Sequence, residues 1–198
     1  MQYAKDEIRQ RIIDVAREEF LDKGFEKASI RTITSKAKTA KSNLYNYFKD
    51  KDDLFHAVLE STTTEIRTGL EAAKQYNVPK DTEDYTLSSQ QMVIDIISKF
   101  IAQHKDDVKL LLFKAQGSSL ERFKYEVLDA FTDNMFEWTQ CIHSKKDVSR
   151  LFVRTVCSFY LNMIEQLFLE GSSVDMMKYI KEIAVFVYHG WKNVFNEE

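Results

Sequence analysis

Apolar residues recur at intervals of three and four positions along most of the chain, a spacing typical of α-helices that bury one face. Only five Gly and one Pro interrupt the pattern, beside 14 Phe and 9 Tyr, so we expect long helices with few turns. The sequence therefore predicts an all-α fold. The predicted helices cover residues 5–23, 30–37, 40–48, 51–76, 88–104, 106–116, 118–143, 147–170 and 173–195.

Capping residues mark several of the predicted helix ends. Gly24 follows the first helix and fits a left-handed C-cap. Asp50 is a good N-cap for the helix that follows it. Ser118 with Glu121 three residues later resembles a capping box, which predicts a helix start at residue 118.

The segment 30–51 has the pattern of two short helices joined by a tight turn. The second helix has Leu44 and Phe48 one turn apart on its buried side. Amides can pair with base edges in the major groove of DNA, and phenols and lysines with phosphates. The outward side of this helix carries such groups, at Lys41, Ser42, Asn43, Tyr45, Asn46 and Tyr47. The segment therefore predicts a helix-turn-helix whose second helix recognises DNA.

The distribution of charge supports this interpretation, although the whole chain has a net charge of −3. Residues 27–51 hold seven cations and one anion. Residues 1–51 hold twelve cations and eight anions, so the rest of the chain carries a net charge of −7. A basic segment on an acidic body can turn one face toward a polyanion. A solvated, lysine-rich surface has the same charge count, but its coincidence with the helix-turn-helix pattern favours DNA.

The run from Leu44 to Leu54, Leu-Tyr-Asn-Tyr-Phe-Lys-Asp-Lys-Asp-Asp-Leu, follows Gly24-Phe25 and Ser29-Ile30. In these residues the chain resembles the DNA-binding domain of the TetR family of bacterial transcriptional regulators. Two positions depart from the family pattern: Lys38 stands where the turn usually has Gly, and Ala40 where the recognition helix usually has a Ser cap. Thr39 is the candidate replacement for that cap.

The resemblance implies an N-terminal three-helix helix-turn-helix DNA-binding domain over residues 1–50. It implies a C-terminal helical ligand-binding and dimerisation domain over residues 51–198. A protein of this kind binds double-stranded DNA at a palindromic operator and responds to a small-molecule effector, which the sequence does not identify. We predict that Lys41, Ser42, Asn43 and Asn46 read bases, that Tyr45, Tyr47, Lys49 and Lys51 contact phosphates, and that Arg31 belongs to the same surface.

The last two predicted helices, 147–170 and 173–195, are apolar over more than one stripe. A helix that is apolar on most sides must be covered on most sides. We expect these helices to pack inward on one face and against a second subunit on the other, which forms a homodimer through a four-helix interface. A two-fold dimer supplies two heads for two half-sites. A fully internal helix pair in a monomer is the alternative.

Several large side chains of the predicted middle helices are candidates for an effector pocket, because such pockets are mostly apolar with a few placed polar groups. Each of them has plain core packing as its more usual role. The candidate effector-binding residues are Phe100, His104, Phe113, Phe131, Met135, Trp138 and Tyr160.

The sequence gives little support for a metal site, a catalytic site or a membrane-spanning segment. Cys141 and His143 form a single closely spaced pair, which is short of a zinc pattern, so we expect no metal and no cofactor. We recognise neither a nucleophile elbow nor a phosphate-binding Gly-rich loop, and we do not expect an enzyme. No apolar run approaches the roughly 20 residues that cross a bilayer, and the N-terminus does not resemble a signal peptide. We therefore expect a cytoplasmic protein.

The leading hypothesis is a homodimeric TetR-like regulator, a repressor that an effector releases from its operator. The first alternative is a non-specific or architectural DNA-binding protein without an effector. The second is a helical enzyme or interaction module whose basic surface binds an acidic partner.

Overall fold

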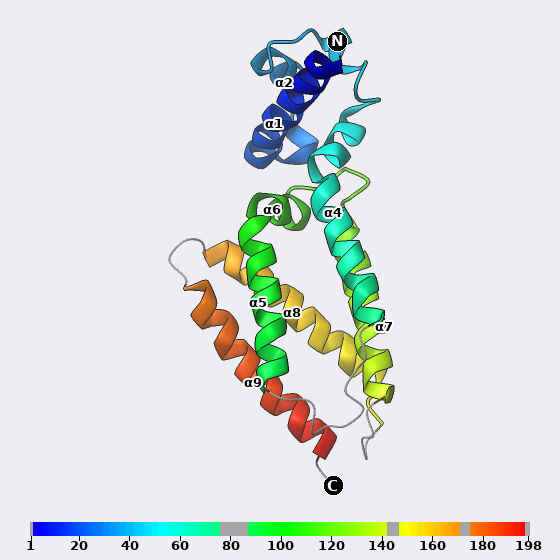
Figure 1. Cartoon of the computed structure of the whole chain (residues 1–198), viewed down its shortest axis with the longest axis vertical. Coiled ribbons are helices and arrows are strands. Elements are labelled where there is room, and N and C mark those ends of the chain that lie inside the picture. Colours follow the sequence, from blue (N-terminus) through cyan, green and yellow to red (C-terminus); the bar gives the residue numbers. More distant parts are fainter. Residues whose placement is uncertain (1, 76–86, 142–146, 171–174, 197–198) are drawn as a thin grey trace. The chain divides into compact units, whose positions relative to one another are not determined.

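The computed structural model describes residues 2–75, 87–141, 147–170 and 175–196. In these ranges the chain is helical, without strands, as predicted (Figure 1). The helices are α1 (Gln2–Lys27), α2 (Ile30–Lys36), α3 (Lys41–Leu44), α4 (Lys51–Gln75), α5 (Leu87–Gln103), α6 (Lys105–Phe113), α7 (Phe123–Cys141), α8 (Arg150–Glu170) and α9 (Met176–Asn196). None of these helices is both long enough and apolar enough to span a membrane.

The chain forms two compact units. The first unit contains Met1–Ile66 and Lys105–Lys124, and the second contains Arg67–His104 and Tyr125–Glu198. Helix α4 begins in the first unit and ends in the second. The functional division that we predict at residue 50 stays a prediction.

An aromatic cluster forms the centre of the first unit. Phe20 packs edge-on against Phe55 at 4.9 Å between ring centroids, and Phe25 lies 5.1 Å from Phe55. Gly24 lets the chain turn between Phe20 and Phe25, because its φ of 75° lies in the region that favours glycine. The break predicted at Gly24 is therefore present, and Phe25 returns to the core beyond it.

A buried polar contact joins three helices of the first unit. The Asp107 carboxylate on α6 lies against the guanidinium of Arg17 on α1 and accepts a hydrogen bond of 2.6 Å from Thr62 on α4. Burial lowers the pKa of Arg17, although nearby carboxylates act in the opposite direction. Because one carboxylate serves both partners, this contact fixes α6 against α1 and α4.

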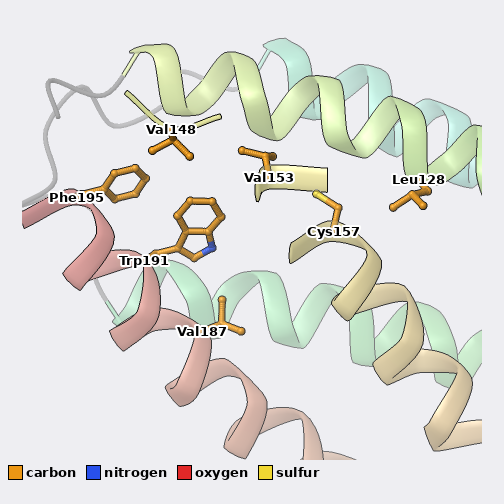
Figure 2. Packing of buried hydrophobic residues seen from close by; sticks show 7 residues of the cluster. All are labelled: Leu128, Val148, Val153, Cys157, Val187, Trp191 and Phe195. Carbon is orange, nitrogen blue, oxygen red and sulfur yellow. The ribbon is translucent and has the colours of Figure 1, made fainter. Parts of the chain in front are cut away.

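The second unit has its own core, formed by α7, α8 and α9 (Figure 2). Trp191 stacks on Phe195, with 5.3 Å between their centroids, and both face the apolar residues of α8. Trp138 from α7 meets Trp191 edge-on at 5.9 Å. The buried members of the cluster are Leu128, Val148, Val153, Cys157, Val187, Trp191 and Phe195.

Three sequence expectations need correction. Helix α7 begins at Phe123 rather than at residue 118, because successive tight turns precede it. Ser118 and Glu121 still accept backbone hydrogen bonds, from Leu120 and Gly117, but they stabilise these turns instead of a helix start. In the predicted helix 88–104, the apolar spacing places Ile96 with Val93, Phe100 and Ile101 on the inner face, but Ile96 is 59% exposed.

Candidate nucleic-acid interface

A complete capping motif closes the turn between α2 and α3. Lys38 has a φ of 52°, so the residue that replaces the usual Gly does adopt the left-handed conformation. The N–H of Lys38 donates to the Ser35 carbonyl at 3.2 Å, and that of Thr39 donates to the Thr34 carbonyl at 3.0 Å. These two bonds form a Schellman motif at the end of α2. The strain at Lys38, about 1–2 kcal/mol, is thus offset by two backbone hydrogen bonds.

The start of α3 has no side-chain cap. Ala40 occupies the N-cap position in extended conformation and offers no hydrogen-bonding side chain. The idea that Thr39 replaces the cap is wrong, because its hydroxyl oxygen accepts from the Asn43 side chain at 2.8 Å instead of from a backbone N–H. Regular α-helix ends at Leu44, and the chain continues to Phe48 in tight turns, so the recognition segment is shorter as a helix than predicted.

Most of the predicted DNA-contacting side chains lie on the surface of the first unit. Lys41, Ser42 and Asn46 are exposed, and Tyr45 is 45% exposed with the Lys41 ammonium 5.9 Å from its ring centre. Asn43 is half-buried and accepts from the Asn46 amide at 3.3 Å. The other members of the set are Tyr47, which is half-buried, and Arg31 and Lys49, which are exposed. Cations, amides and phenols thus share one short segment and its neighbours.

Lys51 differs from the rest of the predicted set. Its ammonium donates to the carbonyls of Phe25 at 2.8 Å, Glu26 at 3.2 Å and Ala28 at 3.4 Å. It also lies 4.5 Å from the centre of the Phe25 ring. These contacts stabilise the end of α1 and engage all three ammonium protons. The phosphate contact predicted for Lys51 stays a prediction, and its side chain has a structural role in this conformation.

The recognition segment is held by residues of the buried side that the sequence predicts. Leu44 and Phe48 are buried, as are Ile12 of α1 and Ile33 of α2. Arg9 of α1 covers Phe48, with its guanidinium carbon 5.4 Å from the ring centre. On the same helix, Arg11 donates to the Ala37 carbonyl at 3.0 Å. Helix α1 therefore fixes both the turn and the recognition segment.

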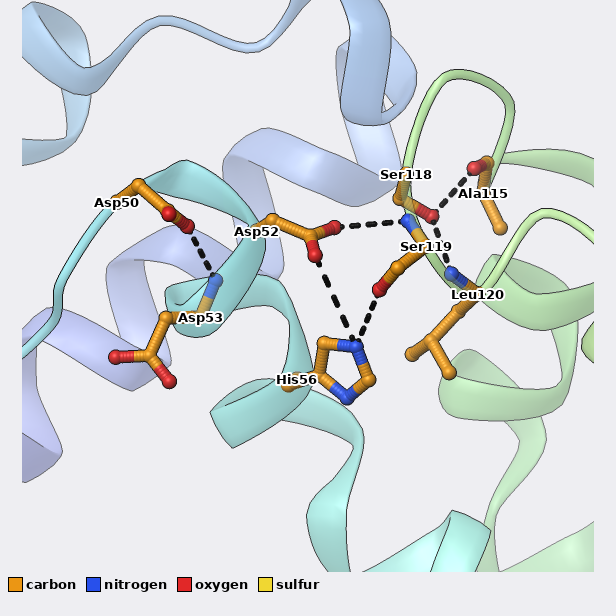
Figure 3. Close-up of polar contacts among 8 residues, drawn as sticks. All are labelled: Asp50, Asp52, Asp53, His56, Ala115, Ser118, Ser119 and Leu120. Carbon is orange, nitrogen blue, oxygen red and sulfur yellow. Dashed lines mark hydrogen bonds and ion pairs between the residues drawn. The ribbon is translucent and has the colours of Figure 1, made fainter.

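A polar network fixes the start of α4 (Figure 3). Asp50 accepts from the Asp53 N–H at 2.8 Å, which confirms the predicted cap. Asp52 accepts from the Ser119 N–H at 3.0 Å, and His56 Nε2 shares a hydrogen bond of 2.5 Å with Ser119 Oγ. Asp52 lies 3.9 Å from the same His56 nitrogen, so it does not orient the ring through Nδ1 as a catalytic triad requires. The network ties α4 to the turns that precede α7.

The candidate effector residues fall in both units. Phe113 belongs to the first unit and is exposed, whereas the other six lie in the second. Phe100 and His104 pack ring against ring at 4.7 Å. Phe131, Met135, Trp138 and Tyr160 are partly buried and pack against the core cluster of the second unit. Burial raises the pKa of Tyr160 to about 12, so its hydroxyl is neutral at physiological pH.

Two sets of polar residues were missed from the sequence. Arg17 and Asp107 are far apart along the chain, and no local pattern connects them. Ser98 and Asn134 are two further buried polar positions, and Asn134 directly follows the polar Thr132 and Asp133, so no local signal marked it. Among the described residues, no group of three or more His, Cys, Asp or Glu side chains could hold a metal ion; His143 lies outside those residues.

Comparison with known proteins adds a sequence match and a shared fold. Residues 12–58 match the model of bacterial regulatory proteins of the tetR family. No curated protein sequence matches the chain.

Solved structures extend the likeness beyond the head. A putative fatty acid metabolism regulator of Clostridium perfringens is 16% identical, with a TM-score of 0.68 over 91% of this chain and 97% of that chain. NalD of Pseudomonas aeruginosa, the secondary repressor of the MexAB-OprM multidrug efflux pump, is 15% identical, with a TM-score of 0.66 over 95% and 96%. FadR of Bacillus subtilis, solved with stearoyl-CoA, is 15% identical, with a TM-score of 0.64 over 91% and 98%.

Identities this low show the fold alone. They do show it over nearly the full length of each chain, including the part that the family model leaves unmatched. The match over residues 12–58 thus assigns this N-terminal segment to the model of bacterial regulatory proteins of the tetR family, and the chain as a whole shares the fold of these solved transcriptional regulators.

Proposed function

We propose that the protein is a homodimeric repressor that binds a palindromic operator and leaves it when a small-molecule effector binds the second unit. The observation that carries the proposal is the exposed polar side of the recognition segment, held from behind by the buried Leu44 and Phe48. A rigid support of this kind lets a short helix present a fixed set of groups to a groove.

Within this proposal, Lys41, Ser42, Asn43 and Asn46 read bases, and Tyr45, Tyr47, Lys49, Lys51 and Arg31 position the head on phosphates. The Asn46 amide already donates to Asn43, and the Asn43 amide donates to Thr39. The two asparagines therefore hold one another in place before DNA arrives, which reduces the conformational freedom lost on binding.

The proposed homodimer rests on apolar side chains that the single chain leaves exposed on α8 and α9. Leu151 is 75% exposed, Leu169 65% and Phe186 69%. Monomeric proteins rarely expose large contiguous patches of apolar side chains. Where such a patch is exposed, it usually marks an interaction site. The broad apolar character that the sequence shows in both helices agrees with a second covered face. Other exposed apolar residues of these helices are Phe152, Phe159, Met177 and Val185.

Substitution of Phe186 tests the dimer. Phe186→Glu places a charge in the proposed interface and should convert the protein to a monomer that has lost most of its operator affinity, because two heads no longer bind together. Lys181→Glu, an exposed position on the same helix, is the control for the charge change. Mass measurement in solution reads the result, and a dimer in the Phe186→Glu variant contradicts the proposed interface.

The proposed effector acts by differential affinity. A ligand shifts a two-state equilibrium only as far as it prefers one state, so it must bind more tightly to the state whose heads do not fit the operator. Among proteins of similar fold, FadR was solved with stearoyl-CoA and NalD is a repressor of an efflux pump. The bound stearoyl-CoA in one and the repressor role of the other support a repressor that responds to a small molecule. No observation favours the architectural alternative.

Selection of bound fragments from genomic DNA tests the proposal as a whole. A specific regulator should enrich a short palindrome and bind it at least about a thousandfold more tightly than random duplex at the same salt concentration. Enrichment without a common palindrome, or equal affinity for both duplexes, would overturn the proposed function. Because TetR-like operators are expected near the regulated genes, the recovered fragments also indicate which compounds to test as effectors.

A further inference from the structure

Three polar side chains of the recognition segment and its turn are joined by successive hydrogen bonds. Asn43 Nδ2 donates to Thr39 Oγ1 at 2.8 Å, and Asn46 Nδ2 donates to Asn43 Oδ1 at 3.3 Å. The residues are four and three positions apart, so the bonds follow one face of the segment. Thr39 and Asn43 are half-buried, and Asn46 is exposed. These three residues, the amide relay, thus connect the turn to the surface.

The backbone fixes the inner end of the amide relay. The N–H of Thr39 donates to the Thr34 carbonyl at 3.0 Å, as part of the Schellman motif that ends α2. Lys38, directly before it, has a φ of 52°. The Thr39 hydroxyl accepts from the Asn43 amide, while the N-cap of α3 has no side-chain hydrogen bond. The turn therefore determines where the hydroxyl lies, and the hydroxyl orients the amide that bonds to it.

The amide relay determines which atoms of Asn46 remain available at the surface. A side-chain amide has two N–H donors on its nitrogen and a carbonyl oxygen that accepts. Because Asn43 Nδ2 bonds to Thr39, the oxygen of Asn43 faces Asn46 and accepts one of its two N–H groups. Asn46 keeps one N–H and its own oxygen, which form a donor beside an acceptor.

A donor beside an acceptor complements one base edge in the major groove. Adenine presents the N7 acceptor next to the N6 donor, whereas guanine presents two acceptors, N7 and O6. The remaining N–H and oxygen of Asn46 can bond to both groups of adenine. Guanine requires two N–H donors, and Asn46 already gives one of them to Asn43.

We propose that Asn46 reads an adenine in each half-site of the operator, and that Thr39 is the positioning residue that selects this base through Asn43. Thr39 does not need to contact DNA for this role. The inference rests on the proposed function, since it takes the recognition segment to bind an operator. It adds the identity of one base and a residue that controls how this base is chosen.

The reverse orientation of the amide relay is the competing explanation. If the Thr39 hydroxyl donated to Asn43 Oδ1, the Asn43 nitrogen would face Asn46 and donate to its oxygen. Asn46 would then present two N–H donors, which match guanine. The base found at this position therefore distinguishes the two orientations.

Selection from a pool of duplexes with a randomised central segment tests the inference on the full chain. Asn46→Ala identifies the position that Asn46 reads, because the base preference there should disappear. Competition binding at fixed salt then compares duplexes that differ only at this position. We expect the wild type to prefer adenine over guanine there by about fivefold or more, the discrimination given by one bidentate contact.

Substitutions of Thr39 test its positioning role. Thr39→Val removes the hydroxyl and should lower the adenine preference about threefold or more, the change given by one hydrogen bond. It should spare positions that neither asparagine reads. Thr39→Ser keeps the hydroxyl and should keep the preference. Thr34→Val, which removes a hydroxyl bonded only within α2, is the control and should change no position.

A double variant shows whether Thr39 acts through Asn46. Asn46→Ala combined with Thr39→Val should lose no more adenine preference than Asn46→Ala alone, because the two residues belong to one relay. A further loss in the double variant would mean that Thr39 affects this base independently of Asn46, which contradicts the inference.

Three other results would overturn the inference: a guanine preference or no preference at the Asn46 position, an unchanged adenine preference in Thr39→Val, or an equal loss at every position in that variant. An equal loss would assign Thr39 a purely structural role in the turn. A selection that yields no common palindrome would refute the proposed operator, and the inference with it. A palindrome without an adenine that depends on Asn46 would refute the inference alone and leave the repressor standing.

Discussion

The first unit pairs its buried carboxylates with groups from other segments. Asp107 meets Arg17 and Thr62, and Glu19 accepts from the Ser29 N–H at 3.4 Å with the Lys36 ammonium 3.6 Å away. The second unit leaves two buried oxygens unpaired and exposes large apolar side chains on α8 and α9. We interpret the first unit as complete in itself. We propose that the second unit is completed by a ligand and by a second subunit.

The comparison indicates which residues affect stability and function together and which affect them separately. In the first unit, a residue that holds the recognition segment is also a residue of the core, so its loss should affect folding and DNA binding together. In the second unit, an unpaired buried polar group lowers stability, as groups at functional sites often do. Substitutions in the two units should therefore differ in the property that they change, as well as in the size of the effect.

The largest expected effect comes from removing the aromatic support of the recognition segment. Phe48→Ala deletes a buried ring that packs beneath Arg9, and should destabilise the protein by about 3–5 kcal/mol. DNA affinity should fall with it, because the segment loses its fixed orientation. Thermal unfolding and binding to the selected operator measure the two effects. Tyr45→Ala, an exposed aromatic residue three positions away, should change stability little and serves as control.

The next effect tests the contact that joins α1, α4 and α6. Asp107→Asn removes the charge opposite Arg17 but leaves an oxygen for Thr62. Breaking a buried ion pair costs about 3–5 kcal/mol, and we expect about 2 here because Arg17 is one-third exposed. Denaturant unfolding provides the measurement. Asp6→Asn, at an exposed position of α1, is the control for the charge change, and an equal effect of the two changes would show that the contact adds nothing.

The head could be predicted from the sequence because its signals are local. Gly24 breaks the first helix, Asp50 caps α4 by accepting from the Asp53 N–H, and Leu44 with Phe48 marks the buried side. Each signal acts within a few residues, so its spacing in the sequence is its spacing in the fold.

What the sequence does not predict depends on contacts between distant segments. The phosphate contact of Lys51 stays a prediction, but the sequence gives no sign that carbonyls at the end of α1, some 23 to 26 residues earlier, accept hydrogen bonds from its ammonium. The periodicity of its helix places Ile96 on the inner face, but its side chain is exposed. An apolar stripe predicts which face of a helix is buried, and it does not determine how much of that face the neighbouring helices cover. The unpaired oxygens of Ser98 and Asn134 could not be predicted, since pairing depends on which helix lies opposite.

The third prediction concerns sequence recognition and should leave stability largely unchanged. Asn43→Ala should lower the discrimination between operator and random duplex by about 1–3 kcal/mol, the contribution of one side chain bonded to a base. Tyr47→Phe should weaken binding to both duplexes by a similar factor, because a phosphate contact carries no sequence information. Competition binding at fixed salt distinguishes the two outcomes. Equal losses on both duplexes for Asn43→Ala would remove it from the base-reading set.

The smallest expected effect lies in the turn itself. Lys38→Gly relieves the strain of a side chain at a φ of 52°, worth about 1–2 kcal/mol, but it also frees the unfolded chain by about 0.5–1 kcal/mol. The difference predicts a stabilisation of about 0.5–1 kcal/mol, measured as a higher denaturant midpoint. Lys41→Gly removes the same charge from a helical position of α3, where glycine has only its entropic cost, and should destabilise. If both variants lost stability equally, Lys38 would be unstrained, and the Schellman bonds alone would determine the turn. Stability changes of opposite sign for the two variants, which we expect, would show that Lys38 is strained. The core and the paired polar groups of the first unit would then hold the recognition segment in place despite that strain.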